Sequence, residues 1–173
     1  MTEKASNKTG LWFLLLSLFV VFLDQASKIW IVNNLALYQD INVWPVFDIT
    51  YVQNPGAAFS FLSDAGGWQR WFFTAIAVVI SILLTVWILK TPGKQKLLLT
   101  SYSLILGGAI GNVVDRINYG YVVDFIHFYY ESWSFPAFNI ADIAISCGAA
   151  LLILEAVLDH KNQAAEKTEN VEH

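Results

Sequence analysis

Four apolar segments of membrane-spanning length constrain this chain more than any other feature. We expect helices at about residues 11–32, 70–89, 97–115 and 138–158. A bilayer core needs about 20 mostly apolar residues in helical form, and each segment meets this requirement. Only 14% of the residues are charged, compared with about a quarter in ordinary soluble domains. The sequence therefore predicts one membrane-embedded α-helical domain over residues 1–160.

The first apolar segment could also be a signal peptide, because Lys4 and Lys8 precede it. No small-residue cleavage site follows the segment, and the residues after Lys28 are again apolar. We therefore expect a helix that is retained in the protein.

The lysines are distributed unevenly among the segments that connect the helices. They cluster before the first helix, in the 90–96 loop and in the C-terminal tail: Lys4, Lys8, Lys90, Lys94, Lys96, Lys161 and Lys167. Positive residues favour cytoplasmic loops, which predicts that both termini and the 90–96 loop are cytoplasmic. Residues 33–70 and 116–137 are then extracytoplasmic. Residues 161–173 are predicted to form a disordered cytoplasmic tail.

The two extracytoplasmic connections contain strand-like sequences. The sequence "VFDITYVQ" at 46–53 alternates and is rich in β-branched residues, and "NPG" at 54–56 then supplies a turn. A second strand-like run, "YVVDFIHFYY", follows Gly120. Tryptophans and tyrosines near these segments are typical of an interfacial aromatic belt. We expect a small β-rich platform at the outer surface of the membrane.

Polar residues collect at the predicted outer ends of the helices. The acids at this depth come from separate parts of the chain: Asp24 in the first helix, Asp115 in the third, Asp142 at the start of the fourth, and Asp124 in the outer loop between the third and fourth. An acid within a membrane helix costs about 2.5–3.5 kcal/mol on insertion scales. These carboxylates are therefore expected to face one another or water.

Helical spacing places several of these polar groups on shared faces. Asn139, Asp142 and Ser146 are three and four residues apart, so they share one face of the fourth helix. The third helix carries another stripe of small and polar residues: Ser101, Gly108, Gly111, Asn112 and Asp115. Gly107 and Gly111 also form a GxxxG pair, which allows helices to approach closely.

Some of the polar groups have a structural interpretation. Asp24 and Lys28 are four residues apart and are expected to form an interfacial ion pair, with the lysine extending outward. Asp115 is expected mainly to orient Arg116. The lone Cys147 excludes an intrachain disulfide and is expected to be a small packing residue.

Asp124 and Asp142 have no comparable partner in the sequence. Asp124 has only apolar neighbours, and no basic residue lies within a turn of Asp142. Two close carboxylates cannot both ionise, so one keeps a proton while the other can take a proton from water. This chemistry suits peptide hydrolysis of the aspartic type. A membrane proton or ion pathway and a non-enzymatic assembly subunit are the alternatives.

Other chemistries lack their characteristic residues. The chain has no HExxH motif for zinc, no GxSG-type serine site and no GxGD signature. We expect no metal and no cofactor. The net charge of −4 provides no basic stripe, so nucleic acid is not expected as a partner.

Five short blocks occur in order along the chain: "DQASK" at 24–28, "NPGAAFS" at 54–60, "GGAIGNVVDR" at 107–116, "VVDF" at 122–125 and "PAFNIAD" at 136–142. With these blocks on a frame of four predicted helices, the chain resembles the lipoprotein signal peptidases (signal peptidase II), a family of bacterial membrane aspartyl proteases. The resemblance covers the body of the chain, from about Asp24 to Ser146.

The resemblance implies that Asp124 and Asp142 are the catalytic pair of a four-helix enzyme with an outer β-cradle. The residues implied to line the substrate cleft are Asn54, Gly56, Asn112, Arg116 and Asn139. Those implied to have a supporting role are Asp24, Lys28, Asp115 and Ser146.

The resemblance also implies the substrate and the location. The substrate is a prolipoprotein whose lipobox cysteine carries diacylglyceryl, and cleavage falls just before that cysteine. We expect a monomer surrounded by membrane lipids in the bacterial plasma (inner) membrane, with its active site at the extracytoplasmic (periplasmic) face.

Overall fold

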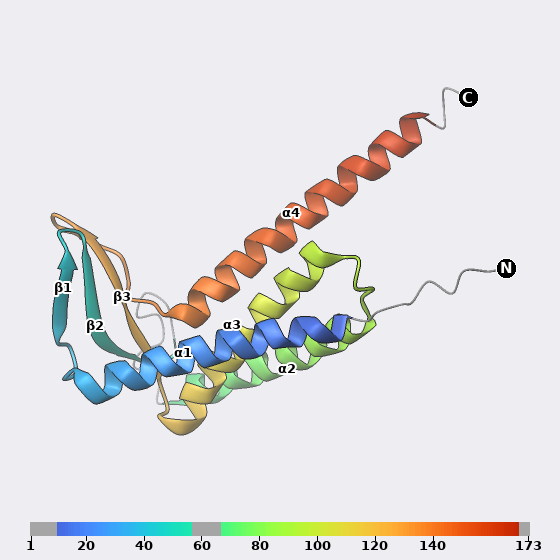
Figure 1. Cartoon of the computed structure of the whole chain (residues 1–173). Coiled ribbons are helices and arrows are strands. Elements are labelled where there is room, and N and C mark those ends of the chain that lie inside the picture. Colours follow the sequence, from blue (N-terminus) through green and yellow to red (C-terminus); the bar gives the residue numbers. More distant parts are fainter. Residues whose placement is uncertain (1–9, 57–66, 170–173) are drawn as a thin grey trace.

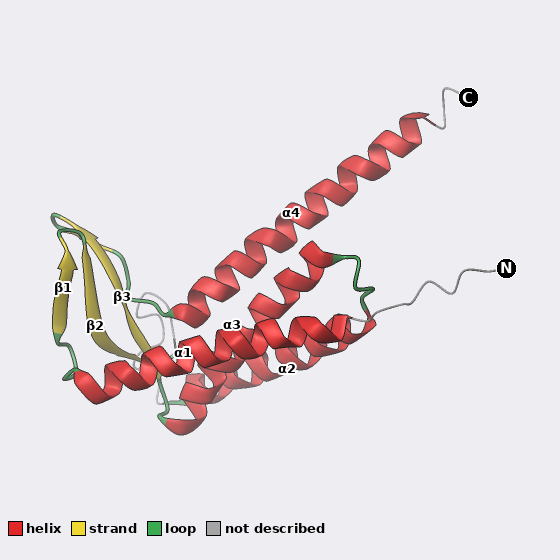
Figure 2. Ribbon diagram, viewed as in Figure 1, coloured by secondary structure: helices red, strands yellow, loops and turns green. Residues whose placement is uncertain are grey.

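Long helices and a small antiparallel sheet make up the computed structural model of this chain, which describes residues 10–56 and 67–169. The helical elements are η1 (Gly10–Phe13), α1 (Leu14–Asn34), α2 (Trp68–Lys90), α3 (Lys96–Asn118) and α4 (Ile140–Glu169). The strands are β1 (Asp40–Trp44), β2 (Phe47–Asn54), β3 (Val122–Tyr130) and β4 (Trp133–Ser134). The helices extend away from the sheet, which stands at one end of the molecule (Figure 1). Figure 2 shows the same division between helices and strands.

The surface of the helices is mostly apolar and uncovered. Each of α1 to α4 is long and apolar enough to cross a membrane, and only 17% of the most apolar stretch of α2 is buried. Large side chains such as Phe19, Phe22 and Ile82 point away from the bundle and are more than half exposed. Apolar surface of this extent is suited to lipid rather than water. The prediction of a four-helix membrane protein with a small β-rich platform is confirmed.

The helix ends follow from local sequence. Thr91 is extended, with ψ at 131°, and ends α2 because Pro92 follows it. The C-terminal end of α4 differs from the prediction of a disordered tail from residue 161, since the helix continues to Glu169. The sequence "DHKNQAAEKTE" over residues 159–169 is polar, but it contains no glycine or proline and is rich in helix formers. The apolar span of α4 therefore ends before the helix does.

The sheet has the strand order β1-β2-β3-β4 and is antiparallel throughout. The strand predicted at 46–53 is β2, and the one predicted after Gly120 is β3. One face of the sheet packs on the end of α1, where Ile31 and Leu35 join a core with strand residues that are at most 6% exposed: Tyr51, Val123 and Phe125. Burying such side chains contributes about 1.5–3 kcal/mol each. This core fixes the sheet to the end of the helices.

An irregularity in β3 places two polar side chains, three positions apart, on the same face of the sheet. The N–H groups of Phe125 and Ile126 both donate to the carbonyl oxygen of Phe138, at 3.0 and 2.8 Å. The pairing of β2 with β3 also shifts register in this region. Such a β-bulge inserts one residue and changes the alternation of side chains. Asp124 and His127, three positions apart, therefore line the same side of the sheet.

Helix α3 lies at the centre of the bundle and packs against α1, α2 and α4. Its glycines permit the close approach that the GxxxG pair predicted. A Cβ atom added at Gly107 would lie 2.7 Å from the Cβ of Val20, and one at Gly111 would lie 2.5 Å from Oδ2 of Asp24. Larger residues at these two positions would force α1 away from α3.

A buried ion cluster joins α1 to α3. The Nζ atom of Lys28 lies 2.9 Å from Oδ2 of Asp24 and 2.9 Å from Oδ2 of Asp115, and none of the three side chains is more than 1% exposed. The ion pair of Asp24 and Lys28 is present as predicted. The expectation that Lys28 extends outward is wrong, because Asp115 and the Oδ1 atom of Asn112, at 3.0 Å, hold its ammonium inside the protein.

The same carboxylates also bind backbone groups of other elements. Oδ1 of Asp24 accepts from the N–H of Ala141 in α4 at 2.9 Å, and Oδ2 of Asp115 accepts from the N–H of Val123 in β3 at 3.0 Å. Neither of these two bonds involves Arg116, so the role of Asp115 in orienting Arg116 stays a prediction. The two bonds fix the start of α4 and of β3 against the helices.

We expect Lys28→Met to destabilise the protein by about 3–5 kcal/mol, because it leaves two buried carboxylates without their counter-charge. Thermal unfolding in detergent would measure this as a lower Tm. Lys90→Met is the matched control, since Lys90 is an exposed lysine at a helix end. Equal Tm values for the two variants would show that the cluster does not stabilise the fold.

Candidate active site

The site is built around the first turn of α4. Oδ1 of Asn139 accepts from the N–H of Asp142 at 2.9 Å, and Oδ2 of Asp142 accepts from the N–H of Asn139 at 3.3 Å. These reciprocal bonds form a capping box, which satisfies two N–H groups at the start of a helix. The N-terminal end of a helix also favours a negative charge such as that of Asp142. The residues that begin α4 are thus the residues of the predicted site.

Asn139 connects this helix start to β3. Its Nδ2 atom donates to Oδ1 of Asp124 at 2.6 Å. The second oxygen of Asp124, Oδ2, accepts from Nδ2 of Asn54 in β2 at 2.9 Å. Asp124 is only 2% exposed. One asparagine therefore contacts both predicted acids, Asp124 with its side chain and Asp142 through the helix cap.

Asn112 connects the site to the buried ion cluster. Its Nδ2 atom donates to Oδ1 of Asp142 at 2.8 Å, while its Oδ1 atom accepts from Nζ of Lys28 at 3.0 Å. The orientation of this amide is determined by its partners, because the ammonium can only donate. A chain of contacts thus runs from Lys28 through Asn112 to Asp142.

The surroundings of Asp124 change its acidity. Burial raises the pKa of Asp124 to about 7, and repulsion by the carboxylate of Asp142 acts in the same direction. The donors Asn54 and Asn139 oppose this rise, as does the positive charge of Lys28. A pair of carboxyl groups in this situation can hold one proton and one negative charge near neutral pH. Among the described residues, no three His, Cys, Asp or Glu side chains are grouped to hold a metal ion.

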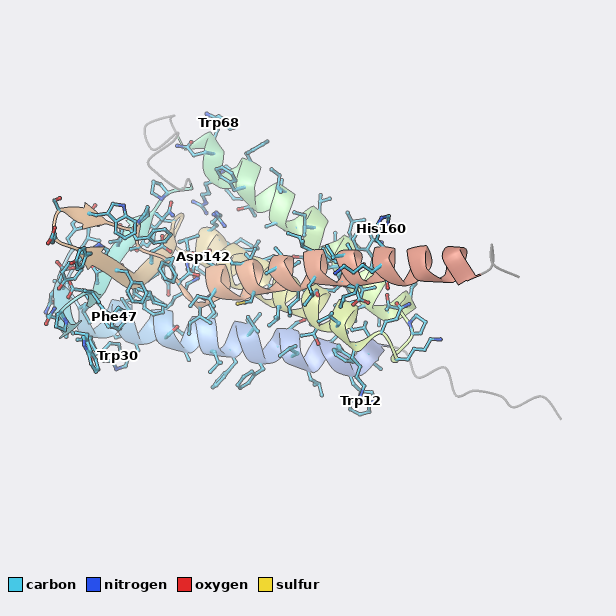
Figure 3. The ribbon with its side chains drawn as sticks, turned by 90° about the horizontal axis from the view of Figure 1, so that it is seen from above. Trp12, Trp30, Phe47, Trp68, Asp142 and His160 are labelled. Atoms are coloured by element: carbon cyan, nitrogen blue, oxygen red, sulfur yellow. The ribbon has the colours of Figure 1, made fainter. Side chains whose placement is uncertain are left out.

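Both acids line an open cleft of about 1330 Å³. Its walls are the polar face of the sheet, the segment 134–138 and the first two turns of α4. Figure 3 places Asp142 near the end of the molecule that carries Phe47, whereas Trp12 and His160 lie towards the opposite end. The cleft is therefore located where the helices meet the sheet.

The predicted cleft residues Arg116 and Gly56 also line this space. Arg116 donates to the carbonyl oxygen of Asn112 at 3.3 Å. Gly56 has a φ of +147° and would bring an added Cβ atom to 3.2 Å from Phe73. Its N–H donates to Oδ1 of Asn54 at 3.0 Å, which closes the turn after β2. Residues 57–60 of the "NPGAAFS" block lie outside the described residues.

The structure shows one contact residue that was not predicted and changes the interpretation of another. Gln25 was missed, although its Nε2 atom donates to Oδ1 of Asp115 at 2.9 Å and to the carbonyl oxygen of Gly111 at 3.1 Å. Cys147 was expected to be a small packing residue, but its side chain is exposed and lines the cleft. Ser146, predicted to have a supporting role, lines the cleft beside it.

We expect Asn139→Ala to be less stable than Asn139→Ser by about 1 kcal/mol, because a serine hydroxyl can still cap α4 and a methyl group cannot. Both variants lose the donor to Asp124, so their difference isolates the cap. Thermal unfolding of the two proteins under one condition measures it. Identical Tm values would mean that the capping box does not stabilise the start of α4.

Comparison with known proteins identifies relatives along nearly the whole chain. The family model described as "Signal peptidase (SPase) II" matches residues 16–158. A lipoprotein signal peptidase of Pseudoalteromonas translucida is 56% identical over 89% of this chain and 93% of its own length. One from Yersinia enterocolitica is 51% identical over 96% of both chains.

Solved structures of bacterial membrane enzymes also match the fold of this chain. A bacterial membrane enzyme determined by the in meso method at 2.3 Å resolution matches with a TM-score of 0.78 and 34% identity, over 87% of this chain and 90% of that one. A second bacterial membrane enzyme, solved at 1.9 Å, gives a TM-score of 0.72 at the same identity. The resemblance drawn from five short blocks is thus confirmed over the length of the fold, and the chain belongs to the signal peptidase II family.

Proposed function

We propose that this protein is an aspartic endopeptidase that removes the signal peptide from prolipoproteins, with Asp124 and Asp142 as its catalytic pair. The observation that carries the proposal is the bridge made by Asn139, which contacts both of the acids that line the open cleft. Membership of the signal peptidase II family supports the reaction. The raised pKa of Asp124 supports the shared proton that the reaction needs.

In this proposal Asp142 is the ionised member of the pair and Asp124 holds the proton. Asp142 lies in the first turn of α4, where the helix dipole stabilises its charge. It also accepts from Asn112, whose oxygen is bonded to the ammonium of Lys28. Asp124 lies on a strand and accepts from neutral amides, so its charged form has weaker support.

The two acids then act in sequence on the peptide bond. Asp142 takes a proton from a water molecule whose oxygen attacks the carbonyl carbon, while Asp124 gives its proton to the carbonyl oxygen. The tetrahedral intermediate collapses as Asp142 passes its proton to the leaving amine, and the proton from the intermediate's hydroxyl group returns to Asp124. Asn54 and Asn139 stabilise the charge that Asp124 carries between these steps.

We further propose that the scissile bond lies just before a cysteine that carries diacylglyceryl. The cleft opens where apolar helices meet a polar sheet, so acyl chains could stay in the bilayer while the peptide reaches the acids. Asn54, Gly56 and Arg116 would contact the peptide in the cleft. The lysine distribution supports an extracytoplasmic site with cytoplasmic termini in a bacterial inner membrane. We expect the monomer to be active, since one chain supplies both acids.

Asp124→Asn and Asp142→Asn should each reduce cleavage of a diacylglyceryl-modified lipobox peptide by roughly 10³-fold or more, because each removes a group that transfers a proton. Both amides are close in size to the native side chains, so the Tm should fall little. Turnover in detergent micelles measures the loss.

Asp159→Asn is the matched control, because Asp159 is an exposed acid near the far end of the span of α4. It should cleave as fast as the native protein. Substantial turnover by folded Asp142→Asn would refute the catalytic pair, and measurement of proton flux through liposomes would then test the transport alternative.

The rate should fall as the pH rises through about 7, because Asp124 must carry a proton and its pKa is raised to about 7. The hydrogen bond from Asn54 lowers the pKa of Asp124. Asn54→Ala removes this bond, so the pKa of Asp124 should rise and the decline in rate should shift to higher pH. Profiles of kcat/KM against pH measure both effects. A native rate that keeps rising to pH 9 would contradict the assignment of the proton to Asp124.

A further inference from the structure

The cleft continues beyond the two acids in two directions that differ in chemistry. On one side, the helix half consists of Ile143, Ser146 and Cys147, which follow Asp142 along α4. On the other side, the sheet half consists of Asp40, Thr50, His127 and Ser134, which come from all four strands. The helix half belongs to an apolar membrane span, whereas the sheet half stands outside the spans.

The sheet half owes its polarity to the register of the strands. Asp40 pairs with Thr50, and Asp48 pairs with His127, so each pair projects to one face of the sheet. The bulge in β3 brings His127 to the same face as Asp124. The result is a continuous polar surface that begins at a catalytic acid and runs away from the membrane spans.

The two halves fit the two sides of a cleaved signal peptide. A signal peptide carries an apolar segment before its cleavage site, which matches the helix half. The residues after the scissile bond lead out of the membrane, so they must leave across the sheet half. This direction of the substrate rests on the proposed function.

The carboxylate of the sheet half is that of Asp40, which is exposed and lines the cleft. A second carboxylate, Asp48, is not among the described lining residues, and its Oδ2 atom lies 4.0 Å from Nδ1 of His127. Arg116 is the one arginine or lysine among the described lining residues, and it belongs to α3 rather than to the sheet. An acidic side chain of the substrate would therefore meet like charge here, and a basic one would meet opposite charge.

We propose that the sheet half is the subsite for the residues that follow the scissile bond, and that Asp40 makes it favour basic or uncharged side chains over acidic ones. The effect belongs to binding and orientation of the substrate rather than to proton transfer. Asp40 is thus a specificity-determining residue.

The test uses two diacylglyceryl-modified lipobox peptides that differ only in having lysine or glutamate at the second and third positions after the cysteine. The full-length protein in a zwitterionic detergent should cleave the lysine peptide with a kcat/KM roughly two- to fivefold higher, the size expected of exposed charge pairs. The ratio should shrink in 0.5 M salt because of screening. In Asp40→Asn the ratio should move towards one.

Glu131→Gln is the control for net charge, because Glu131 lies on the exposed turn after β3 and is not among the described residues that line the cleft. It should keep the native ratio. Equal cleavage of both peptides by the native protein, or an unchanged ratio in Asp40→Asn, would overturn the subsite while leaving the proposed function intact. Failure to cleave either peptide would overturn the proposed function, and the subsite with it.

Discussion

The rest of the structure depends on one buried ammonium held between two carboxylates. Lys28 contacts Asp24 and Asp115 in an interior where burying an unpaired ion would cost several kcal/mol. Replacing such a cluster with apolar residues often leaves stability unchanged or improved. The main role of the cluster here is therefore to fix the positions of the elements that it joins. The two carboxylates also accept backbone N–H groups, Oδ1 of Asp24 from Ala141 at the start of α4 and Oδ2 of Asp115 from Val123 in β3. Four elements are thereby held in one arrangement.

The proposed chemistry uses the same contacts that define the fold. Asn139 caps the start of α4 and also donates to Asp124. Asn112 accepts from the ammonium of Lys28 and donates to Asp142, so it links the two. Two chemically similar acids thus receive different surroundings, one at a helix start and one on a buried strand. Differences of this kind allow one carboxyl group to act as a base while its neighbour acts as an acid.

Features with a local signal could be predicted from the sequence, whereas contacts between residues of distant elements could not. The four helices and the two longer strands could be predicted from apolar runs and alternation. Asp124 and Asp142 stood out because their sequence neighbours offered no counter-charge. The expectation that Lys28 extends outward was wrong because the four-residue spacing in α1 predicts its contact with Asp24 only. The second partner, Asp115, belongs to α3 and could not be found from this spacing. The short strands β1 and β4 were missed, since every residue in them is exposed and burial imposes no pattern.

The β-bulge opposite Phe138 has a consequence for how this chain can vary in length. The turns after β1 and β3 join exposed strand ends, so an added residue there would leave the facing of the strands unchanged. Between Asp124 and His127 the spacing sets which side chains face the cleft and which face α1. Deleting one residue from that stretch would turn the β3 side chains on one side of the deletion to the opposite face of the sheet. An alignment of relatives should therefore place its insertions in the turns and keep this short interval ungapped.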